Sequence, residues 1–236
     1  GPFAFDDTYV ELEFGGRYEW LDLYGYVDFI DALNSKSSDK HKDNNFFVDI
    51  EPRISIDYLL DKDLSYGALQ ELYFAFDIYY ADPTPGDDKG LKIIWMGLGS
   101  DIEIPWLGKS GVNFYTRFVE ENYGASNEHS FDGYVAHINW FKPIYNFTDS
   151  RFLSFQGYID YEFGSDLDNN DTYRTSDSLQ SYLGLWLHDK KWALGYGLKA
   201  YKNMTQWKDN QKPSFGNGKE TDTTGFAHYF NVGYKF

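Results

Sequence analysis

The sequence predicts an all-β protein, an antiparallel up-and-down transmembrane β-barrel, and three features of the chain support this. Aromatic residues make up 20% of its 236 residues, while the mean hydropathy is only −0.56. No run approaches the roughly 18 apolar residues that a transmembrane helix needs. The closing segment alternates strictly between two kinds of side chain. A barrel with a polar interior and aromatic rims combines all three properties.

The closing segment, 226–236, has the period of two that places successive side chains on opposite faces of a sheet. One face carries Phe226, His228, Phe230, Val232, Tyr234 and Phe236. The segment is about as long as a tilted strand that crosses a bilayer. In a barrel, the last strand pairs with the first and removes both open edges. Taken alone, the segment fits a strand of a soluble β-sandwich equally well.

Further strand-like stretches recur along the chain, separated by clusters of Gly, Pro, Asn and Asp, and none keeps a helical period. About eleven strands are expected, at Asp7–Gly16, Leu21–Leu33, Phe46–Leu60, Leu69–Ala81, Leu91–Pro105, Gly111–Tyr123, Phe131–Ile144, Phe152–Gly164, Ser178–His188, Trp192–Asn203 and Phe226–Phe236.

The connections between these stretches alternate in length, which favours an outer-membrane barrel over a sandwich. The shorter ones are 17–20, 61–68, 106–110, 145–151 and 189–191, and the longer ones are 34–45, 82–90, 124–130, 165–177 and 204–225. Bacterial barrels have even strand numbers and both termini in the periplasm. We therefore expect a single domain over residues 1–236, belonging to a barrel of about twelve strands whose first strand precedes Gly1. Alternatively, Gly1-Pro2 is a cloning scar.

The face that looks into the barrel is clearest in Phe46–Leu60, where Val48, Ile50, Ile54 and Ile56 alternate with charged residues. Because Arg facing lipid near the midplane costs about 2–4 kcal/mol, the charged face must look inward. Pro52 then faces lipid, and its missing N–H predicts a bulge. The same rule places inward Tyr9, Glu11, Glu13, Asp22, Tyr24, Tyr26, Asp28, Asp49, Glu51, Arg53, Ser55, Asp57, Glu71, Tyr73, Asp77, Tyr79, Trp95, Asp101, Glu103, Asn113, Tyr115, Arg117, His137, Asn139, Ser154, Gln156, Tyr158, Asp160, Glu162, Gln180, Tyr182, Trp186, Lys199, Tyr201, Tyr229 and Asn231.

Composition excludes several classes of function. A net charge of −16 argues against nucleic-acid binding, which needs Lys and Arg at the phosphates. The absence of cysteine excludes disulfides, thiol nucleophiles and thiolate metal sites. Asp166–Asp171 begins like a calcium loop, but its sixth and twelfth positions are Asp171 and Asp177 rather than Gly and Glu. We expect no catalytic residue, no cofactor and no metal site.

The predicted lining of rings and carboxylates suits a flat heterocycle that carries hydroxyl groups. A base stacked on an aromatic ring gains about 1–3 kcal/mol, and carboxylates accept hydrogen bonds from hydroxyl and N–H groups. This chemistry fits small polar aromatic solutes or sugars and disfavours phosphorylated ones. Alternatively, the same side chains form a structural network that plugs the interior.

Many short motifs also carry a family resemblance that spans nearly the whole chain. They are Asp-Thr-Tyr-Val-Glu-Leu-Glu (7–13), Asp-Leu-Tyr-Gly-Tyr-Val-Asp (22–28), Ile-Glu-Pro-Arg-Ile-Ser-Ile-Asp (50–57), Asp-Leu-Ser-Tyr-Gly (63–67), Glu-Leu-Tyr-Phe-Ala (71–75), Met-Gly-Leu-Gly-Ser-Asp-Ile (96–102), Asn-Tyr-Gly-Ala-Ser-Asn-Glu (122–128), Phe-Gly-Ser-Asp-Leu (163–167), Phe-Gly-Asn-Gly (215–218) and Val-Gly-Tyr-Lys-Phe (232–236). Together they resemble the nucleoside-specific outer-membrane channels of the Tsx family, with its OmpK-type phage-receptor relatives.

The resemblance implies a monomeric barrel in the bacterial outer membrane that passes nucleosides and deoxynucleosides by passive diffusion. The implied partners are nucleosides, outer-membrane lipid and lipopolysaccharide, and phage or bacteriocin at the extracellular loops. The alternative function is a surface receptor whose lumen is plugged. The substrate-binding residues implied by matched, inward-facing motifs are Tyr9, Glu11, Tyr26, Asp28, Asp49, Glu51, Arg53, Glu71, Tyr73 and Asp77. Arg53, next to Glu51 and Ser55, is also expected to serve as a structural pairing partner.

Overall fold

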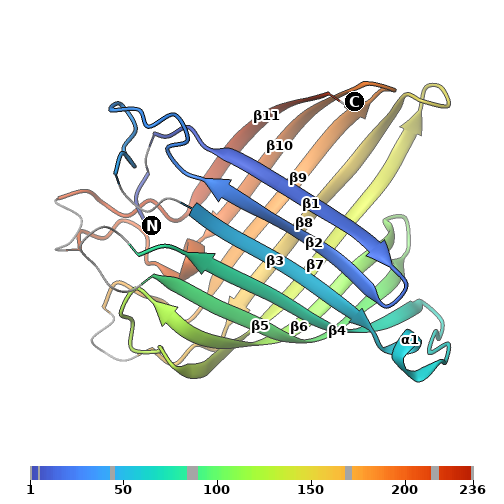
Figure 1. Ribbon diagram of the computed structural model, residues 1–236, viewed down its shortest axis with the longest axis horizontal. Helices are drawn as coiled ribbons and strands as arrows, with labels where there is room; N and C mark the ends of the chain where they lie inside the picture. The colour runs from blue at the N-terminus through green and yellow to red at the C-terminus, as the bar shows by residue number, and fades with distance from the viewer. Residues whose placement is uncertain are drawn as a thin grey trace.

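The computed structural model describes residues 2–4, 6–42, 46–83, 90–167, 172–213 and 218–234. These residues form one sheet of eleven strands, ordered β1 to β11 exactly as along the chain (Figure 1). The strands are β1 Val10–Tyr18, β2 Leu21–Phe29, β3 Phe46–Ser55, β4 Leu69–Ala81, β5 Leu91–Ile104, β6 Gly108–Asn122, β7 Ser130–Asn146, β8 Phe152–Phe163, β9 Ser178–His188, β10 Trp192–Lys202 and β11 Gly225–Tyr234.

Every neighbouring pair of strands is antiparallel, and the sheet rolls up around an interior (Figure 1). The predicted all-β, up-and-down architecture is confirmed. Within the part of the chain that the structure describes, β1 and β11 do not pair, so the ring of strands is not closed. The additional first strand stays a prediction. Among the described residues, no helix is long and apolar enough to cross a membrane.

The predicted alternation of short and long connections holds except at 56–68, which contains a short helix and is longer than 82–90 and 123–129. The connections give the sheet two distinct ends. At one end, which we call the short-turn end, consecutive strands are joined by residues 19–20, 56–68, 105–107, 147–151 and 189–191. At the other, the long-loop end, the joins span 30–45, 82–90, 123–129, 164–177 and 203–224. The N-terminal segment also lies at the long-loop end (Figure 1).

The prediction of one strand over Phe46–Leu60 is wrong for its last five residues. The strand ends at Ser55, which caps the helix α1 (Ile56–Leu60) by accepting the N–H of Tyr58 at 3.1 Å. Asp57 therefore does not extend the inward row of β3. Its carboxylate accepts the backbone N–H groups of Leu64 at 2.8 Å and Leu72 at 3.1 Å, which orders the turn.

The bulge predicted at Pro52 is also wrong. The register between β3 and β4 is the same on both sides of this residue, from Phe47 opposite Ala81 to Ser55 opposite Tyr73. On its other side, Pro52 lies opposite Leu23 in an unbroken ladder with β2. Pro52 has no N–H to donate to the ladder, so pairing is interrupted locally. The strand contains no extra residue at this point and therefore no bulge.

The outer face of the sheet carries large exposed apolar side chains in the middle of the strands. They include Leu12, Phe74, Ile78, Leu98, Phe114, Tyr134, Leu183, Leu185, Leu194, Phe230 and Val232. Between neighbouring strands, from β1 to β11, the polar backbone groups are paired within the sheet, so this face can lie against hydrocarbon.

The substitution Leu98→Arg tests whether this face contacts lipid. Leu98 is 58% exposed and lies near the middle of β5, so Arg there should lower the free energy of unfolding in lipid vesicles by about 2–4 kcal/mol. Phe226→Arg, at the end of β11, should cost only about 0–1 kcal/mol because it lies near the interface. Urea unfolding followed by Trp fluorescence gives both values. Equal values for the two variants would contradict the assignment of this face.

Candidate functional site

Strand register brings most of the predicted interior side chains onto one continuous face. Opposite residues in an antiparallel pair share a face, and Glu11 lies opposite Asp28 while Tyr26 lies opposite Asp49. Asp49 in turn lies opposite Tyr79, and Asp77 opposite Trp95. Tyr9, just before β1, is 54% exposed and lies within electrostatic range of Glu11, Asp28 and Tyr229.

Three of the predicted residues gather into an acidic cluster on β3 and β4. Oxygen atoms of Asp49, Glu51 and Asp77 all lie within 4.8 Å of one another. Asp49 is 5% and Asp77 3% exposed, and each has one carboxylate oxygen without a hydrogen-bond partner. The hydroxyl of Tyr79 donates to the other oxygen of Asp77 at 2.6 Å. The acidic cluster is therefore rich in hydrogen-bond acceptors, and it takes part in none of the ion pairs found among the described residues.

The wall that faces the acidic cluster carries His137 of β7 and Asp160 of β8. The two are opposite in register, and Nδ1 of His137 lies 2.6 Å from Oδ1 of Asp160. Asn139 approaches the other ring nitrogen of His137 at 2.9 Å. Glu51 is within electrostatic range of both His137 and Asp160. Polar groups from strands far apart in the sequence therefore influence one another electrostatically across the interior.

Aromatic rings accompany these polar groups on both walls. The ring centroid of Tyr26 lies 6.0 Å from that of Phe47. On the other wall, Tyr158 and Tyr182 are stacked with centroids 6.2 Å apart and an interplanar angle of 21°. The indole N–H of Trp186 donates to the hydroxyl of Tyr182 at 3.2 Å. Tyr26 and Tyr158 lie within electrostatic range of each other. We call the acidic cluster together with Tyr26, His137, Tyr158, Asp160 and Tyr182 the central belt.

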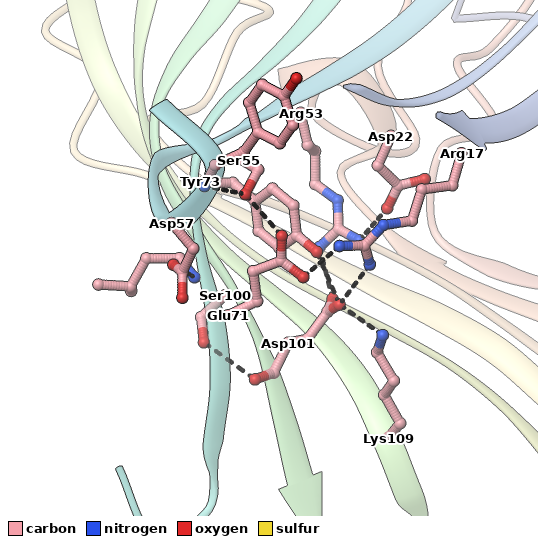
Figure 2. A network of polar contacts seen from close by, with 12 residues as sticks. Arg17, Asp22, Arg53, Ser55, Asp57, Glu71, Tyr73, Ser100, Asp101 and Lys109 are labelled. Carbon is pink, nitrogen blue, oxygen red and sulfur yellow. Dashed lines mark hydrogen bonds and ion pairs between the residues drawn. The ribbon is translucent and has the colours of Figure 1, made fainter. Parts of the chain in front are cut away.

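The remaining predicted residues, Arg53, Glu71 and Tyr73, belong to a separate network near the short-turn end (Figure 2). Its centre is Asp101, 2% exposed, which lies 3.0 Å from Nη1 of Arg53, 2.8 Å from Nζ of Lys109 and 2.9 Å from the donating hydroxyl of Tyr73.

Further ion pairs extend this short-turn network. Arg17 pairs with Glu71, and Arg53 pairs with Asp22 (Figure 2). Ser55 donates to Glu71 at 2.6 Å, and the guanidinium of Arg53 lies 4.3 Å from the ring centroid of Tyr73. Arg53 is a pairing partner, as expected, but it pairs with Asp22 and Asp101 rather than with Glu51. The network contains three cations and three carboxylates, one from each of the strands β1 to β6, and so joins these six strands. They are Arg17, Arg53 and Lys109, and Asp22, Glu71 and Asp101.

Two members of this network, Arg17 and Lys109, were placed in turns by the sequence interpretation. Both lie in strands, since β1 continues to Tyr18 and β6 begins at Gly108. The predicted strand Asp7–Gly16 ends too early, since Gly15, Gly16 and Arg17 all stay in the ladder with β2. The alternation Glu11, Glu13, Gly15, Arg17 was the signal that could have placed Arg17 inward.

A rolled antiparallel sheet with an apolar outer face and a charged, aromatic interior defines the chain as a membrane-spanning β-barrel protein. The profile of a known family, described as "Nucleoside-specific channel-forming protein, Tsx", matches residues 1–236. The chain belongs to this family, which is a non-enzymatic class of bacterial outer-membrane channel-forming proteins.

Individual relatives agree with this assignment. The chain is 39% identical over 236 residues to "Outer membrane protein OmpK" of Vibrio parahaemolyticus, covering 100% of this chain and 81% of that protein. It is 36% identical over 247 residues to "Nucleoside-specific channel-forming protein Tsx" of Klebsiella aerogenes, covering 100% and 83% of the two chains. The protein of the same name in Salmonella typhimurium is 35% identical over 242 residues, with 100% and 83% covered. The predicted family and outer-membrane location are confirmed.

Proposed function

We propose that this channel passes nucleosides and deoxynucleosides selectively and passively, and that the central belt is where they bind. The observation that carries the proposal is the meeting of the acidic cluster with aromatic rings from both walls of the interior. The family description, and the names of the Klebsiella and Salmonella relatives, support the same class of solute.

The proposed mechanism uses two weak interactions that a nucleoside can make at the same time. The base stacks on Tyr26 or on the Tyr158–Tyr182 pair, a contact worth about 1–3 kcal/mol. Ribose hydroxyls and base N–H groups donate to the carboxylates of Asp49, Glu51 and Asp77, which only accept hydrogen bonds while they are ionised. Asp49 and Asp77 each have one oxygen without a partner. Each contact must be weak enough for the solute to leave as readily as it binds. Nucleotides are disfavoured because their phosphates meet the acidic cluster.

Of the ten predicted binding residues, we assign seven to the solute path and three to wall stability. Tyr9, Glu11 and Asp28 lie nearest the long-loop end, and they lead to Tyr26 and the acidic cluster. Arg53, Glu71 and Tyr73 are engaged in the short-turn network. We further infer that the protein is a monomer whose outer face contacts lipid and lipopolysaccharide.

Flux into liposomes that contain the purified, folded protein tests the proposal. Uptake of adenosine and thymidine should be faster than uptake of glucose and should saturate, while the corresponding nucleotides should be largely excluded. Equal uptake of all these solutes would show an unselective pore and contradict binding at the central belt. Liposomes without protein supply the background rate.

A second candidate function, a surface receptor with a plugged lumen, is favoured by the packing of one part of the interior. Ala75, Tyr115, Val119 and Val135 are each at most 1% exposed, and with Trp95 they form a packed cluster along β4 to β7. Small barrels are often filled by their own side chains. A folded protein that admits no solute in the flux measurement would favour this function.

A further inference from the structure

The β8–β9 and β10–β11 connections at the long-loop end fold against the wall of the sheet through one buried polar clasp. Arg117 of β6 donates through Nη1 to Oγ of Ser165 at 2.9 Å and to Oε1 of Gln206 at 2.8 Å. Gln206 in turn donates through Nε2 to Ser165 at 2.5 Å. Arg117 is 2% exposed and Gln206 1%, so the hydrogen bond between them is buried. We call Arg117, Ser165 and Gln206 the clasp.

The clasp joins parts of the fold that are far apart. Arg117 lies on β6 and pairs with Glu162 of β8 at 3.3 Å. Ser165 belongs to the β8–β9 loop, and Gln206 belongs to the short 3₁₀ turn η1 (Met204–Gln206) of the β10–β11 loop. Three strands separate β6 from β10 in the sheet. To reach Arg117, η1 must therefore extend inward from the end of β10.

A second cation reinforces the same arrangement. Arg174 of the β8–β9 loop lies 3.6 Å from the ring centroid of Trp207 and donates to Oδ1 of Asn122 at 3.2 Å. The backbones of the two loops pair as well, with the N–H of Thr175 donating to the carbonyl of Gln206 at 3.0 Å. The loops thus form one body that is attached to the long-loop end of β6 at Asn122.

On its other side, the β10–β11 loop reaches the N-terminal segment that precedes β1. The N–H of Asp222 donates to the carbonyl of Pro2 at 2.8 Å, and Thr221 and Thr223 are at most 2% exposed. A continuous series of contacts therefore runs from β6, through both loops, to the segment beside β1. This series extends across the long-loop mouth of the barrel.

The backbone of η1 is held in a conformation that its residues do not prefer. Thr205 and Gln206 have φ values of 54° and 62°, in the left-handed region, where a β-branched residue such as Thr is uncommon. Such backbone persists only when surrounding contacts determine it, and it is found most often at functional positions. The clasp supplies those contacts.

We propose that the clasp sets the size limit of the long-loop mouth, with Gln206 as the positioning residue that holds the β10–β11 loop across it. This proposal rests on the proposed function as a channel. It adds selection by solute size at the mouth to selection by solute chemistry at the central belt. Solutes larger than a nucleoside are held back by the fixed loops, whatever their affinity for the central belt.

The test compares Gln206→Ala with the wild-type protein and with Gln211→Ala. Gln211 lies in the same loop, and its side chain donates to the carbonyl of Asp209 within that loop rather than to the wall. Gln206→Ala removes both clasp contacts of the loop and leaves the Arg117–Glu162 pair in place, so the barrel should still fold. Arg117→Ala is the second variant, and heat-modifiable migration in gels verifies that each protein is folded.

Liposome swelling with uncharged sugars of increasing size, from pentoses to trisaccharides, gives the size limit without using any nucleoside. We expect Gln206→Ala to raise the rate for di- and trisaccharides severalfold relative to pentoses, and Gln211→Ala to leave the profile unchanged. Trypsin should also cleave at Lys208 faster in Gln206→Ala if the loop is released. Faster cleavage with an unchanged size profile would overturn the proposal.

The outcomes also separate this inference from the proposed function. If the wild-type protein passes pentoses and nucleosides equally well, nucleoside selection fails, but a size profile that widens in Gln206→Ala still supports the clasp. A selective channel whose size profile is the same in all variants retains the proposed function and overturns the clasp.

Discussion

Asp101→Asn is expected to lower the free energy of unfolding by about 3–5 kcal/mol, the usual cost of removing one partner from a buried ion pair. Asp101 is 2% exposed and lies within 3.5 Å of Arg17, Arg53 and Lys109. Asn keeps the shape of the side chain and can still accept from Tyr73, so the change removes mainly the charge. Arg53, itself largely buried, then loses one of its two carboxylate partners and keeps only Asp22. Urea unfolding of the protein in lipid vesicles measures the difference.

Two further variants make this prediction specific to the short-turn network. Asp149→Asn makes the same chemical change in the exposed turn between β7 and β8 and should leave unfolding unchanged. Asp101→Asn combined with Arg53→Met removes the opposing charge as well and should recover part of the loss. If the double variant is less stable by the full sum of the two single changes, the pair is not coupled and the prediction is wrong.

Tyr158→Ala is expected to raise the half-saturation concentration for nucleoside uptake by about 5- to 150-fold. The basis is the loss of one base-stacking contact, worth about 1–3 kcal/mol, converted to a ratio of affinities. Tyr158→Phe keeps the ring and should stay close to the wild-type value. Concentration-dependent uptake of thymidine into liposomes gives the half-saturation value for each variant.

The same strand offers a matched control for this experiment. Tyr161 lies on the outer face of β8, is 43% exposed and stacks on Phe163 rather than on an interior ring. Tyr161→Ala should therefore leave uptake unchanged. A weakened uptake in Tyr161→Ala equal to that in Tyr158→Ala would indicate a general loss of folded channel instead of a binding contact.

The alternation of side chains along each strand could be derived without coordinates. Val48 and Ile50 alternate with Asp49 and Glu51, and the period of two then decides which face avoids lipid. The lengths of the connections likewise predicted the two ends of the sheet. These are local properties, since each depends only on residues that are close in the sequence.

The partners of each interior side chain depend on register and on loop packing, which join residues far apart in the chain. Asp77 meets Asp49 and Glu51 because β4 pairs with β3 in one register, whereas a slip of one residue would turn it outward. Arg53 pairs with Asp22, which lies directly opposite it on β2, and with Asp101 of β5, rather than with Glu51 two residues earlier on the same face. The contact of Gln206 with Arg117 has no sequence signal at all, since it arises only when a loop folds back onto a strand 89 residues earlier. The sequence alone therefore determined the period of two in each strand and which side chains face the interior. Only the tertiary structure decided which polar groups contact one another, because those contacts depend on pairing between distant strands and on loop packing.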